Sequence, residues 1–411
     1  MNQLKSISWT GEDPEEYIKE LAQAIDKGCW VELRSGNKQQ SILKENLLPH
    51  EPGIIIQGGG TSGRYQLCLH PYRHLDQSAL ATGQWLQSIS LDPKNCQIVN
   101  GLPMCHVSGL LPWWRSRCWG AKYISIKPAI MNNPYELEAQ SLSLIDQNKS
   151  PLITSLVPTQ LTRLIQHPSG IRWLQLFSVI WVGGSAISQH IAKQARILNI
   201  RLAPCYGTTE TAAMITSQNP EHFLSGNNLL GIPLNDIQLR IGINNALQIR
   251  TKRIAKFLTE NGELKSIASN NGWWESGDAA ELVIDNQMQQ LKILGRRDTA
   301  INSGGEIVFP EQLQIKLLEA AQKKSIPIDS LLLLPIKNME WGERIVALVR
   351  FNAETINISH QPFLSKLKNI TNDWLPYEKP MNWFNCPELS RNKLGKWELQ
   401  KWQAWVKAKE N

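Results

Sequence analysis

The sequence predicts an α/β fold, with a large N-terminal domain that contains parallel βαβ units and a β-rich part, followed by a smaller α+β domain. Three observations predict it. Between residues 150 and 210, apolar runs of strand length alternate with amphipathic helical segments. Beyond residue 230, short strand-like segments are separated by tight turns. Near residue 310, a helical pattern that starts with a proline opens a second unit.

Length and composition support a globular protein of more than one domain. The chain has 411 residues, of which 42% are hydrophobic and 19% charged. No apolar run approaches the roughly 18 residues of a membrane span, and the first residues lack the apolar core of a secretory signal. We therefore expect a cytoplasmic protein without an integral membrane segment.

Charge and cysteine usage exclude several classes of function. The 43 Lys and Arg against 36 Asp and Glu give a formal charge of +7, but the basic residues occur singly or in short groups. No basic stripe predicts a nucleic-acid partner, whereas a mildly basic surface suits small anionic ligands. The seven cysteines are scattered and form no Cys-x-x-Cys pair, which excludes a disulfide framework and a zinc ribbon.

The N-terminal region offers one helix and one glycine-rich turn. A helical pattern begins at Pro14, and an apolar run over 53–56 predicts a strand that leads into Gly58-Gly59-Gly60-Thr61-Ser62-Gly63. Glycines let backbone amides approach an anion, and hydroxyls add hydrogen bonds, as a polyphosphate requires. The Gly-Lys-Ser/Thr of a Walker A loop is missing. Taken alone, such a stretch is more often a plain surface turn.

The central region reads as β-α-β-α-β. Strands are expected over 152–157, 177–182 and 201–206, with helices over 158–165 and 189–198. Right-handed crossovers between parallel strands place the segments that follow these strands at one edge of the sheet, where ligands of open α/β sheets bind. The candidates for this crevice are Thr159-Gln160, Gly183-Gly184-Ser185 and Gly207-Thr208-Thr209-Glu210.

Two hydroxyls and a carboxylate follow the third strand directly. A threonine can bind a phosphate oxygen while Glu210 holds Mg²⁺ against it, because hard oxygen ligands suit that ion. A helix N-terminus with Thr208 as its cap explains the same residues equally well.

The β-rich part contains a predicted hairpin over 281–284 and 291–294, which Asp278 and Arg296 flank. An aspartate can accept hydrogen bonds from the two hydroxyls of a ribose, and an arginine can serve ribose or phosphate. A simple Asp–Arg ion pair accounts for them nearly as well.

The C-terminal region begins near residues 296–299, so we expect domains over 1–297 and 298–411. Pro310 starts a helix with Leu313, Leu317 and Ala321 on one face. A polar loop over 389–397 carries Lys396 and enters a final helix that shows Leu399, Trp402 and Val406 on one side. A loop lysine can swing into a site, although most are solvated surface.

Taken in order, these pieces resemble the adenylate-forming superfamily of acyl-CoA synthetases, adenylation domains and luciferases, from about residue 54 to residue 400. Within it, the chain is most similar to the o-succinylbenzoate:CoA ligases of menaquinone and phylloquinone biosynthesis. The stretches that indicate this are 104–110, with Met-Cys-His-Val-Ser-Gly-Leu, 155–161, with Ser-Leu-Val-Pro-Thr-Gln-Leu, and 301–310.

The resemblance implies two half-reactions, in which ATP and an acid give an acyl-adenylate and CoA then displaces AMP. ATP, CoA and an aromatic dicarboxylic acid would be the substrates, Mg²⁺ the cofactor, and the small domain would be mobile. The nucleotide-binding residues implied are Thr61, Ser62 and Gly63 for the β- and γ-phosphates, Gly183 and Gly184 beside the adenine, Tyr206 and Gly207, Thr209 at the α-phosphate, Glu210 as the Mg²⁺ ligand, and Asp278 and Arg296 at the ribose. Asp298 would be the hinge, and Lys396 would bridge the acyl carboxylate and the α-phosphate.

The acid site requires an apolar slot for the ring and a polar end for the carboxylate that does not react. The candidates are His106 with Ser108 and Gly109, and Gln160 with Arg163. A structural histidine and an exposed helix face are the alternatives for His106 and Arg163.

The chain departs from the family pattern in two places. Gly58, Gly59 and Gly60 replace hydroxyl residues of the phosphate loop, and the region before this loop is several dozen residues shorter than usual. A ligase for another carboxylic acid, a catalytically impaired nucleotide-binding homologue and an adenylation domain that loads a carrier protein are the alternative functions. The sequence is compatible with a homo-oligomer.

Overall fold

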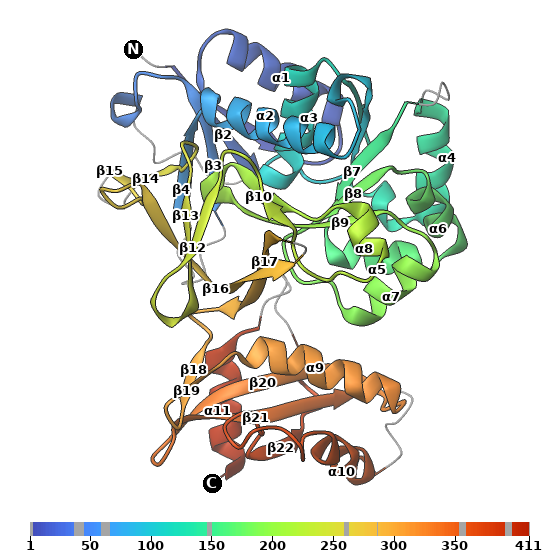
Figure 1. The fold of residues 1–411 in the computed structure, drawn as a ribbon, viewed down its shortest axis with the longest axis vertical. Helices are drawn as coiled ribbons and strands as arrows, with labels where there is room; N and C mark the ends of the chain where they lie inside the picture. Colours follow the sequence, from blue (N-terminus) through green and yellow to red (C-terminus); the bar gives the residue numbers. More distant parts are fainter. Residues whose placement is uncertain are drawn as a thin grey trace. The chain divides into compact units, whose positions relative to one another are not determined.

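The computed structural model of the protein describes residues 3–36, 45–58, 66–145, 150–258, 263–285, 287–352, 359–390 and 397–410. The chain divides into two compact units (Figure 1). The first contains Met1–Ser276 and Glu281–Lys292, and the second contains Gly277–Ala280 and Ile293–Asn411.

A seven-stranded sheet of order β11-β10-β9-β8-β7-β5-β6 forms the centre of the first unit. Its strands are β5 (Gln97–Asn100), β6 (Lys122–Ser125), β7 (Leu152–Leu156), β8 (Val179–Val182), β9 (Leu202–Thr208), β10 (Ala213–Ser217) and β11 (Ile232–Pro233). The strands from β5 to β9 run parallel, and β10 is antiparallel to β9. The three predicted strands and their parallel direction are therefore confirmed.

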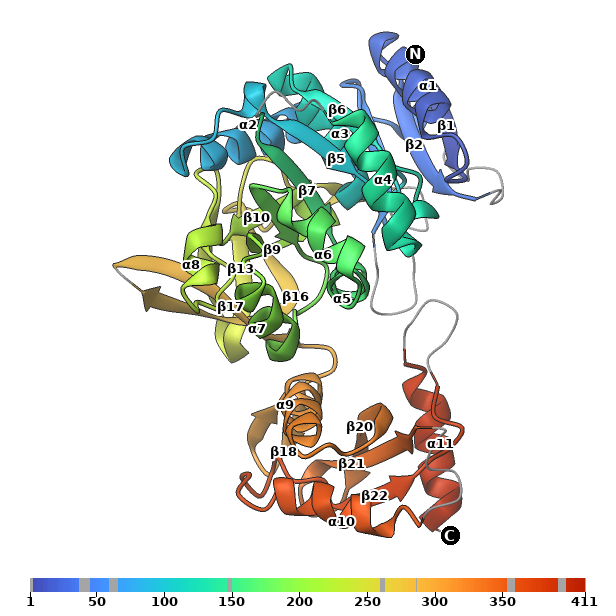
Figure 2. The same cartoon turned by 90° about the vertical axis from the view of Figure 1, so that its right-hand side faces the viewer.

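Helices cover both faces of this sheet (Figures 1 and 2). They are α2 (Tyr72–Ser88), α3 (Val107–Trp119), α4 (Pro134–Leu144), α5 (Pro158–Ile165), α6 (Pro168–Gln175), α7 (Gln189–Ile197) and α8 (Pro220–Leu224). The helices from α4 to α7 share a core with β8 that includes Leu161, Trp173 and Ile180, while Trp85 of α2 contacts Trp181 of β8. The predicted helices α5 and α7 are present, but the separate helix α6 was not predicted.

A second sheet of order β1-β2-β3-β4-β14-β15 packs on the other side of α2 and α3. Its strands are β1 (Leu4–Trp9), β2 (Trp30–Ser35), β3 (Gly53–Gly58), β4 (Gln66–Pro71), β14 (Lys256–Leu258) and β15 (Leu264–Ser266). The first three run parallel, and the predicted helix α1 (Pro14–Asp26) connects β1 and β2. The sequence did not reveal β1 because only Ile7 and Trp9 are buried in it.

A four-stranded sheet of order β12-β13-β16-β17 contains the predicted hairpin. Its strands are β12 (Gln238–Ile241), β13 (Ala246–Arg250), β16 (Trp273–Asp285) and β17 (Met288–Arg296). The two strands of the hairpin are longer than predicted, and both extend to the residues that flank it.

The second unit has an α+β fold, as predicted. Its sheet joins β19-β18-β21-β20, with β22 paired to β21. The elements are β18 (Ile301–Ser303), β19 (Glu306–Val308), α9 (Pro310–Lys323), β20 (Ile328–Asn338), β21 (Gly342–Phe351), α10 (Gln361–Ile370), β22 (Asn382–Asn385) and α11 (Leu399–Glu410). The helix α9 buries Leu313, Leu317 and Ala321, and α11 buries Trp402 and Val406, so both predicted helices present the expected face to the core.

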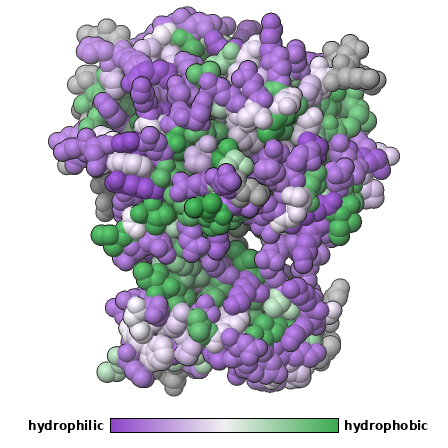
Figure 3. All heavy atoms as spheres, in the orientation of Figure 1, coloured by the Kyte–Doolittle hydropathy of each residue, from purple (hydrophilic) through white to green (hydrophobic). Residues whose placement is uncertain are grey.

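Hydrophilic residues predominate on the surface of the first unit in the view of Figure 3. Among the helices that the structure describes, none combines the length and apolar character needed to cross a membrane.

Candidate nucleotide and acid site

The carboxyl ends of β5, β7, β8 and β9 meet at one edge of the central sheet, because these strands are parallel. The strand β7 is followed by α5, β8 by Gly183-Gly184, and β9 by a short 3₁₀ helix, η4 (Thr209–Thr211). The three segments predicted to form a crevice therefore leave the sheet at the same edge. The loop after β5, which carries His106, joins them there.

Two glycines at this edge occupy positions that favour glycine, each for a different reason. Gly184 has φ +85°, in the left-handed region that favours glycine. A Cβ at Gly207 would overlap the backbone of Ala213, on the neighbouring strand β10. The close approach of β9 and β10 thus fixes the backbone that leads into Thr209 and Glu210.

Glu210, the predicted Mg²⁺ ligand, is half-buried in η4. Burial and the Glu210 carboxylate raise the pKa of the Cys68 thiol. Within the described residues, no basic side chain lies within ion-pair distance of this carboxylate, and no cluster of three metal-ligating side chains is found there. A single carboxylate fits Mg²⁺, which usually keeps waters and phosphate oxygens as its other ligands.

The strands on either side of the glycine-rich loop adjoin η4. The strand β3 contacts η4, and His70 of β4 makes a hydrogen bond of 2.7 Å from Nε2 to the carbonyl oxygen of Thr209. Thr61, Ser62 and Gly63 themselves lie outside the described residues, as does Lys396.

A pair of buried histidines supports Thr209. A carbonyl oxygen can only accept, so His70 Nε2 carries its proton. Burial lowers the pKa of His70 to about 4 and that of His74 to about 3. Because both rings are neutral at pH 7, His70 Nδ1 accepts a hydrogen bond of 3.2 Å from His74 Nδ1. These hydrogen bonds, which the sequence did not predict, link α2 to η4, the 3₁₀ helix that contains Thr209 and Glu210.

The loop that carries His106 is held by a buried asparagine. Asn100 Oδ1 accepts from the Leu102 amide at 3.1 Å, and its Nδ2 donates to the Gly109 carbonyl at 2.9 Å. Gly109 is buried against the backbone of Pro103, where a Cβ would clash, whereas Ser108 is exposed. Gly109 therefore lets α3 pack closely on this loop.

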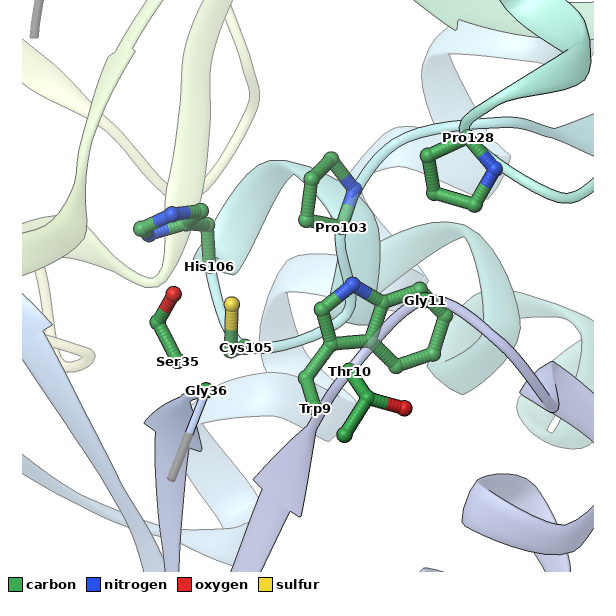
Figure 4. Close-up of a pocket in the computed structure, with 9 residues that line it drawn as sticks. All are labelled: Trp9, Thr10, Gly11, Ser35, Gly36, Pro103, Cys105, His106 and Pro128. Atoms are coloured by element: carbon green, nitrogen blue, oxygen red, sulfur yellow. The ribbon is translucent and has the colours of Figure 1, made fainter. Parts of the chain in front are cut away.

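A pocket of about 470 Å³ opens beside His106 (Figure 4). His106, Cys105 and Ser35 lie together at one end, while Trp9 with Pro103 and Pro128 forms the other. Thr10, Gly11 and Gly36 complete the lining. The surrounding protein lowers the pKa of His106 because it hydrates the charged ring less well than water does. No lining side chain is anionic or a permanent cation, so the pocket suits a neutral part of a substrate better than a phosphate.

Gln160 and Arg163 have other partners. Gln160 Oε1 accepts from the Val157 amide at 3.2 Å and so caps α5. Arg163 is exposed and donates to the side chain of Asn132. Neither residue lines the pocket beside His106.

A buried arginine that was not among the predicted site residues lies on α3. Arg115 is 4% exposed, its guanidinium lies 5.1 Å from the ring centre of Trp181, and its Nε has no hydrogen-bond partner. Burial lowers the pKa of Arg115 to about 10, and Trp181 precedes Val182, the last residue of β8. It is thus a cation close to the sheet edge without a carboxylate partner among the described residues.

Asp278 and Arg296 form an ion pair in the second unit. Arg296 Nη1 lies 3.3 Å from Asp278 Oδ1, and its Nε lies 3.2 Å from Asp298 Oδ1. Arg296 therefore connects the residue predicted at the ribose with the predicted hinge residue.

Comparison with known proteins finds a family model, relatives and solved structures that match this chain. The model of the family described as AMP-binding enzyme matches residues 8–250. The 2-succinylbenzoate–CoA ligase of Escherichia coli K12 is 26% identical over 346 residues, which cover 84% of this chain and 67% of that protein. The corresponding ligase of Oceanobacillus iheyensis is 27% identical over 311 residues, covering 72% of this chain and 60% of that protein. The chain thus spans about two thirds or less of the length of these relatives.

Solved structures with the same fold include o-succinylbenzoate CoA synthetase from Bacillus subtilis. Its complex with the acyl-adenylate intermediate has a TM-score of 0.73 at 16% identity, covering 98% of this chain and 88% of that chain. Its complex with ATP and magnesium has a TM-score of 0.70 at 16% identity, and the match covers 97% of this chain and 89% of that chain.

Proposed function

Because the chain belongs to the family of AMP-binding enzymes, we propose that it is an ATP-dependent acid:CoA ligase that converts 2-succinylbenzoate into 2-succinylbenzoyl-CoA. The observation that carries the proposal is the shared sheet edge at which Gly183-Gly184, Thr209-Glu210 and the His106 loop emerge. The relatives from Escherichia coli and Oceanobacillus iheyensis, both 2-succinylbenzoate–CoA ligases, support the choice of acid. Such a ligase would act in menaquinone or phylloquinone biosynthesis, and we place the reaction in the cytoplasm, where ATP and CoA are available.

In the first half-reaction, an oxygen of the acid carboxylate attacks the α-phosphorus of ATP. A bond forms between the two, the bond to the β-phosphate bridging oxygen breaks, and pyrophosphate leaves. Thr209 would donate to the α-phosphate and Glu210 would hold Mg²⁺, which neutralises charge on the phosphates when bound. Fixed positive charge at the place where negative charge develops lowers such a barrier by several kcal/mol.

The remaining residues are proposed to have the roles that the family resemblance implies. Thr61, Ser62 and Gly63 would bind the β- and γ-phosphates, and Lys396 would bridge the two reacting anions. Asp278 and Arg296 would bind the ribose, exchanging part of their ion pair for its hydroxyls.

In the second half-reaction, the CoA sulfur attacks the acyl carbon and the bond from this carbon to the AMP oxygen breaks, so that AMP leaves and the thiol proton passes to solvent. A rotation of the small domain about Asp298 would exchange the residues that face the acyl group between the steps.

The second carboxylate of the acid requires a cation or several donors. Burial lowers the pKa of His106 and so disfavours its charged form, and Arg163 is engaged on an exposed helix face. Arg115 is charged, buried and without a carboxylate partner in the described part of the chain. Arg115 does not line the pocket beside His106, so we propose that the carboxylate that does not react extends beyond this pocket and pairs with Arg115.

Pyrophosphate release from ATP and Mg²⁺, followed with a panel of acids, tests the proposal. We expect turnover with 2-succinylbenzoate that far exceeds turnover with benzoate or a fatty acid, and thioester formation when CoA is added. Equal turnover of all three acids would overturn the choice of acid, and no pyrophosphate with any acid would indicate an impaired homologue.

A further inference from the structure

The backbone that follows Glu210 converges on one buried guanidinium. Arg253 belongs to the segment that connects β13 to β14 and is fully buried. Its Nη1 donates to the carbonyls of Thr211 at 2.6 Å and Ala212 at 3.2 Å. Its Nη2 donates to the carbonyl of Met214 at 2.8 Å. Three carbonyls within four residues thus depend on one side chain that lies about forty positions further along the chain.

This backbone has a conformation that needs such support. Ala212 and Ala213 have φ angles of +50° and +79°, and alanine, unlike glycine, is strained in the left-handed region. Strained backbone persists only where its surroundings determine it. Ser78 Oγ adds a hydrogen bond of 2.7 Å to the Ala212 carbonyl, and the Ala255 amide donates to the Glu210 carbonyl at 2.8 Å.

The charge of Arg253 is balanced on its other side. Its Nε lies 2.8 Å from Asp236 Oδ2, and the Asp236 side chain is 11% exposed. A buried ion pair stabilises a fold only when its remaining donors and acceptors are used. The donors of Arg253 that do not bind Asp236 form hydrogen bonds to Ser78 Oγ and to the carbonyls after Glu210.

We infer that Arg253, held by Asp236, is a positioning residue that fixes the direction in which Thr209 and Glu210 present their side chains to Mg·ATP. The inference rests on the proposed function for the identity of this ligand. A guanidinium can bind several carbonyls in one plane, whereas an ammonium offers a point charge without that fork. The planar set of donors of the arginine is therefore required in addition to its positive charge.

The variant Arg253→Lys tests this inference because it keeps a charge for Asp236 and loses the planar donors. Supports behind metal ligands typically contribute about 10–100-fold in metal affinity or activity. We expect the Mg²⁺ concentration for half-maximal pyrophosphate release to rise by about tenfold or more, with a lower kcat at saturating ATP and acid.

Arg196→Met is the matched control. Arg196 donates to the carbonyls of Phe223 at 2.6 Å and Asn227 at 3.1 Å, at the outer helices α7 and α8. We expect this variant to lower the melting temperature and leave the Mg²⁺ requirement unchanged. If Arg253→Lys changes the melting temperature alone, as the control does, its role is structural only and the inference is wrong.

Asp236→Asn serves if Arg253→Lys does not fold, as judged by circular dichroism. It retains all donors of Arg253 and removes the anion that orients them, so we expect a smaller shift of the Mg²⁺ requirement in the same direction. An unchanged requirement would overturn the inference.

Binding of Mg·ATP to the unmodified protein, measured by calorimetry without acid, separates the two proposals. Binding without turnover of 2-succinylbenzoate overturns the choice of acid, and the inference is then judged by the loss of Mg·ATP affinity in Arg253→Lys. Absence of Mg·ATP binding overturns both.

Discussion

At the scale of single residues, the proposed reaction depends on two positive charges of different kinds. Lys396 belongs to a polar stretch of the sequence, where a lysine can be recruited to the reacting atoms. Arg115 is enclosed by the protein, and its desolvation favours an anionic partner once a substrate brings one. The two charges are expected to affect different kinetic quantities: Lys396 the rate of adenylation, and Arg115 the kcat/KM for the acid.

Lys396→Ala should lower the rate of adenylation by about 10²–10³, because the charge that bridges carboxylate and α-phosphate is lost. Thioester formation from supplied acyl-adenylate should be retained. Both rates are measured separately, by pyrophosphate release and by thioester absorbance, with Lys393→Ala as the control from the same stretch. Equal loss of both half-reactions would contradict the role in the first step.

Arg115→Met should reduce kcat/KM for 2-succinylbenzoate by about 10–100-fold, as expected for a lost hydrogen bond to a charged group. Activity with benzoate, which has no second carboxylate, should change little, so the ratio of the two substrates is the measurement. Arg117→Met is the control, because Arg117 is exposed and pairs with Asp26 at 3.2 Å. A proportional loss with both acids would indicate a packing role.

At the scale of elements, the histidine pair couples the site to pH. His70 and His74 stay neutral in the folded protein down to about pH 4, whereas histidines of an unfolded chain take up protons below about 6.5. The unfolded state therefore binds more protons on acidification. The stability is present in full above pH 6.5 and is lost as the pH falls toward 4.

Acidification from pH 7 to pH 5 should lower the free energy of unfolding by about 2 kcal/mol or more, by linkage at these two rings. His74→Leu should reduce the slope of that free energy against pH by about one proton, measured by urea unfolding at several pH values. His190→Leu, at an exposed position of α7, should leave the slope unchanged. A His74→Leu slope equal to that of the unmodified protein would disprove the linkage.

Elements differ in how far the sequence predicts them. All four residues of β8 are buried, so the continuous apolar run typical of a central parallel strand is visible. In β1 only two residues face the core, and nothing in its composition marks it as a strand. Arg115 was not predicted as a site residue because it lies in a run of buried residues of α3. An arginine within an apolar run of a helix is itself an indication of a functional residue. Asp236 and Arg253 are 17 positions apart, and only tertiary packing brings them together.

At the scale of the whole molecule, the proposed cycle requires the two halves of the reaction to use different arrangements of the chain. Asp298, whose carboxylate shares Arg296 with Asp278, was predicted as the hinge. Hinge residues absorb changes of φ and ψ, and their replacement alters turnover without touching the reacting atoms.

Asp298→Ala should slow thioester formation by about tenfold and affect adenylation less, because only the second step follows the rotation. The ratio of the two half-reaction rates is the measurement. Asp329→Ala is the control, since Asp329 pairs with Arg350 at 2.6 Å in the same unit. A ratio that stays constant in Asp298→Ala would argue against this position as the hinge.

The pairing of β4 with β14 has a consequence for the order in which the protein is made. Leu69 lies opposite Lys256, so β4, the strand beside the glycine-rich loop, can pair with β14 only after nearly two hundred more residues have been synthesised. Arg253 leaves the ribosome in the same late segment. A nascent chain that ends at residue 250, where the family match stops, would expose an unpaired strand edge and leave the carbonyls after Glu210 without their donor. Shortened versions for expression should therefore extend past Ser266, the end of β15.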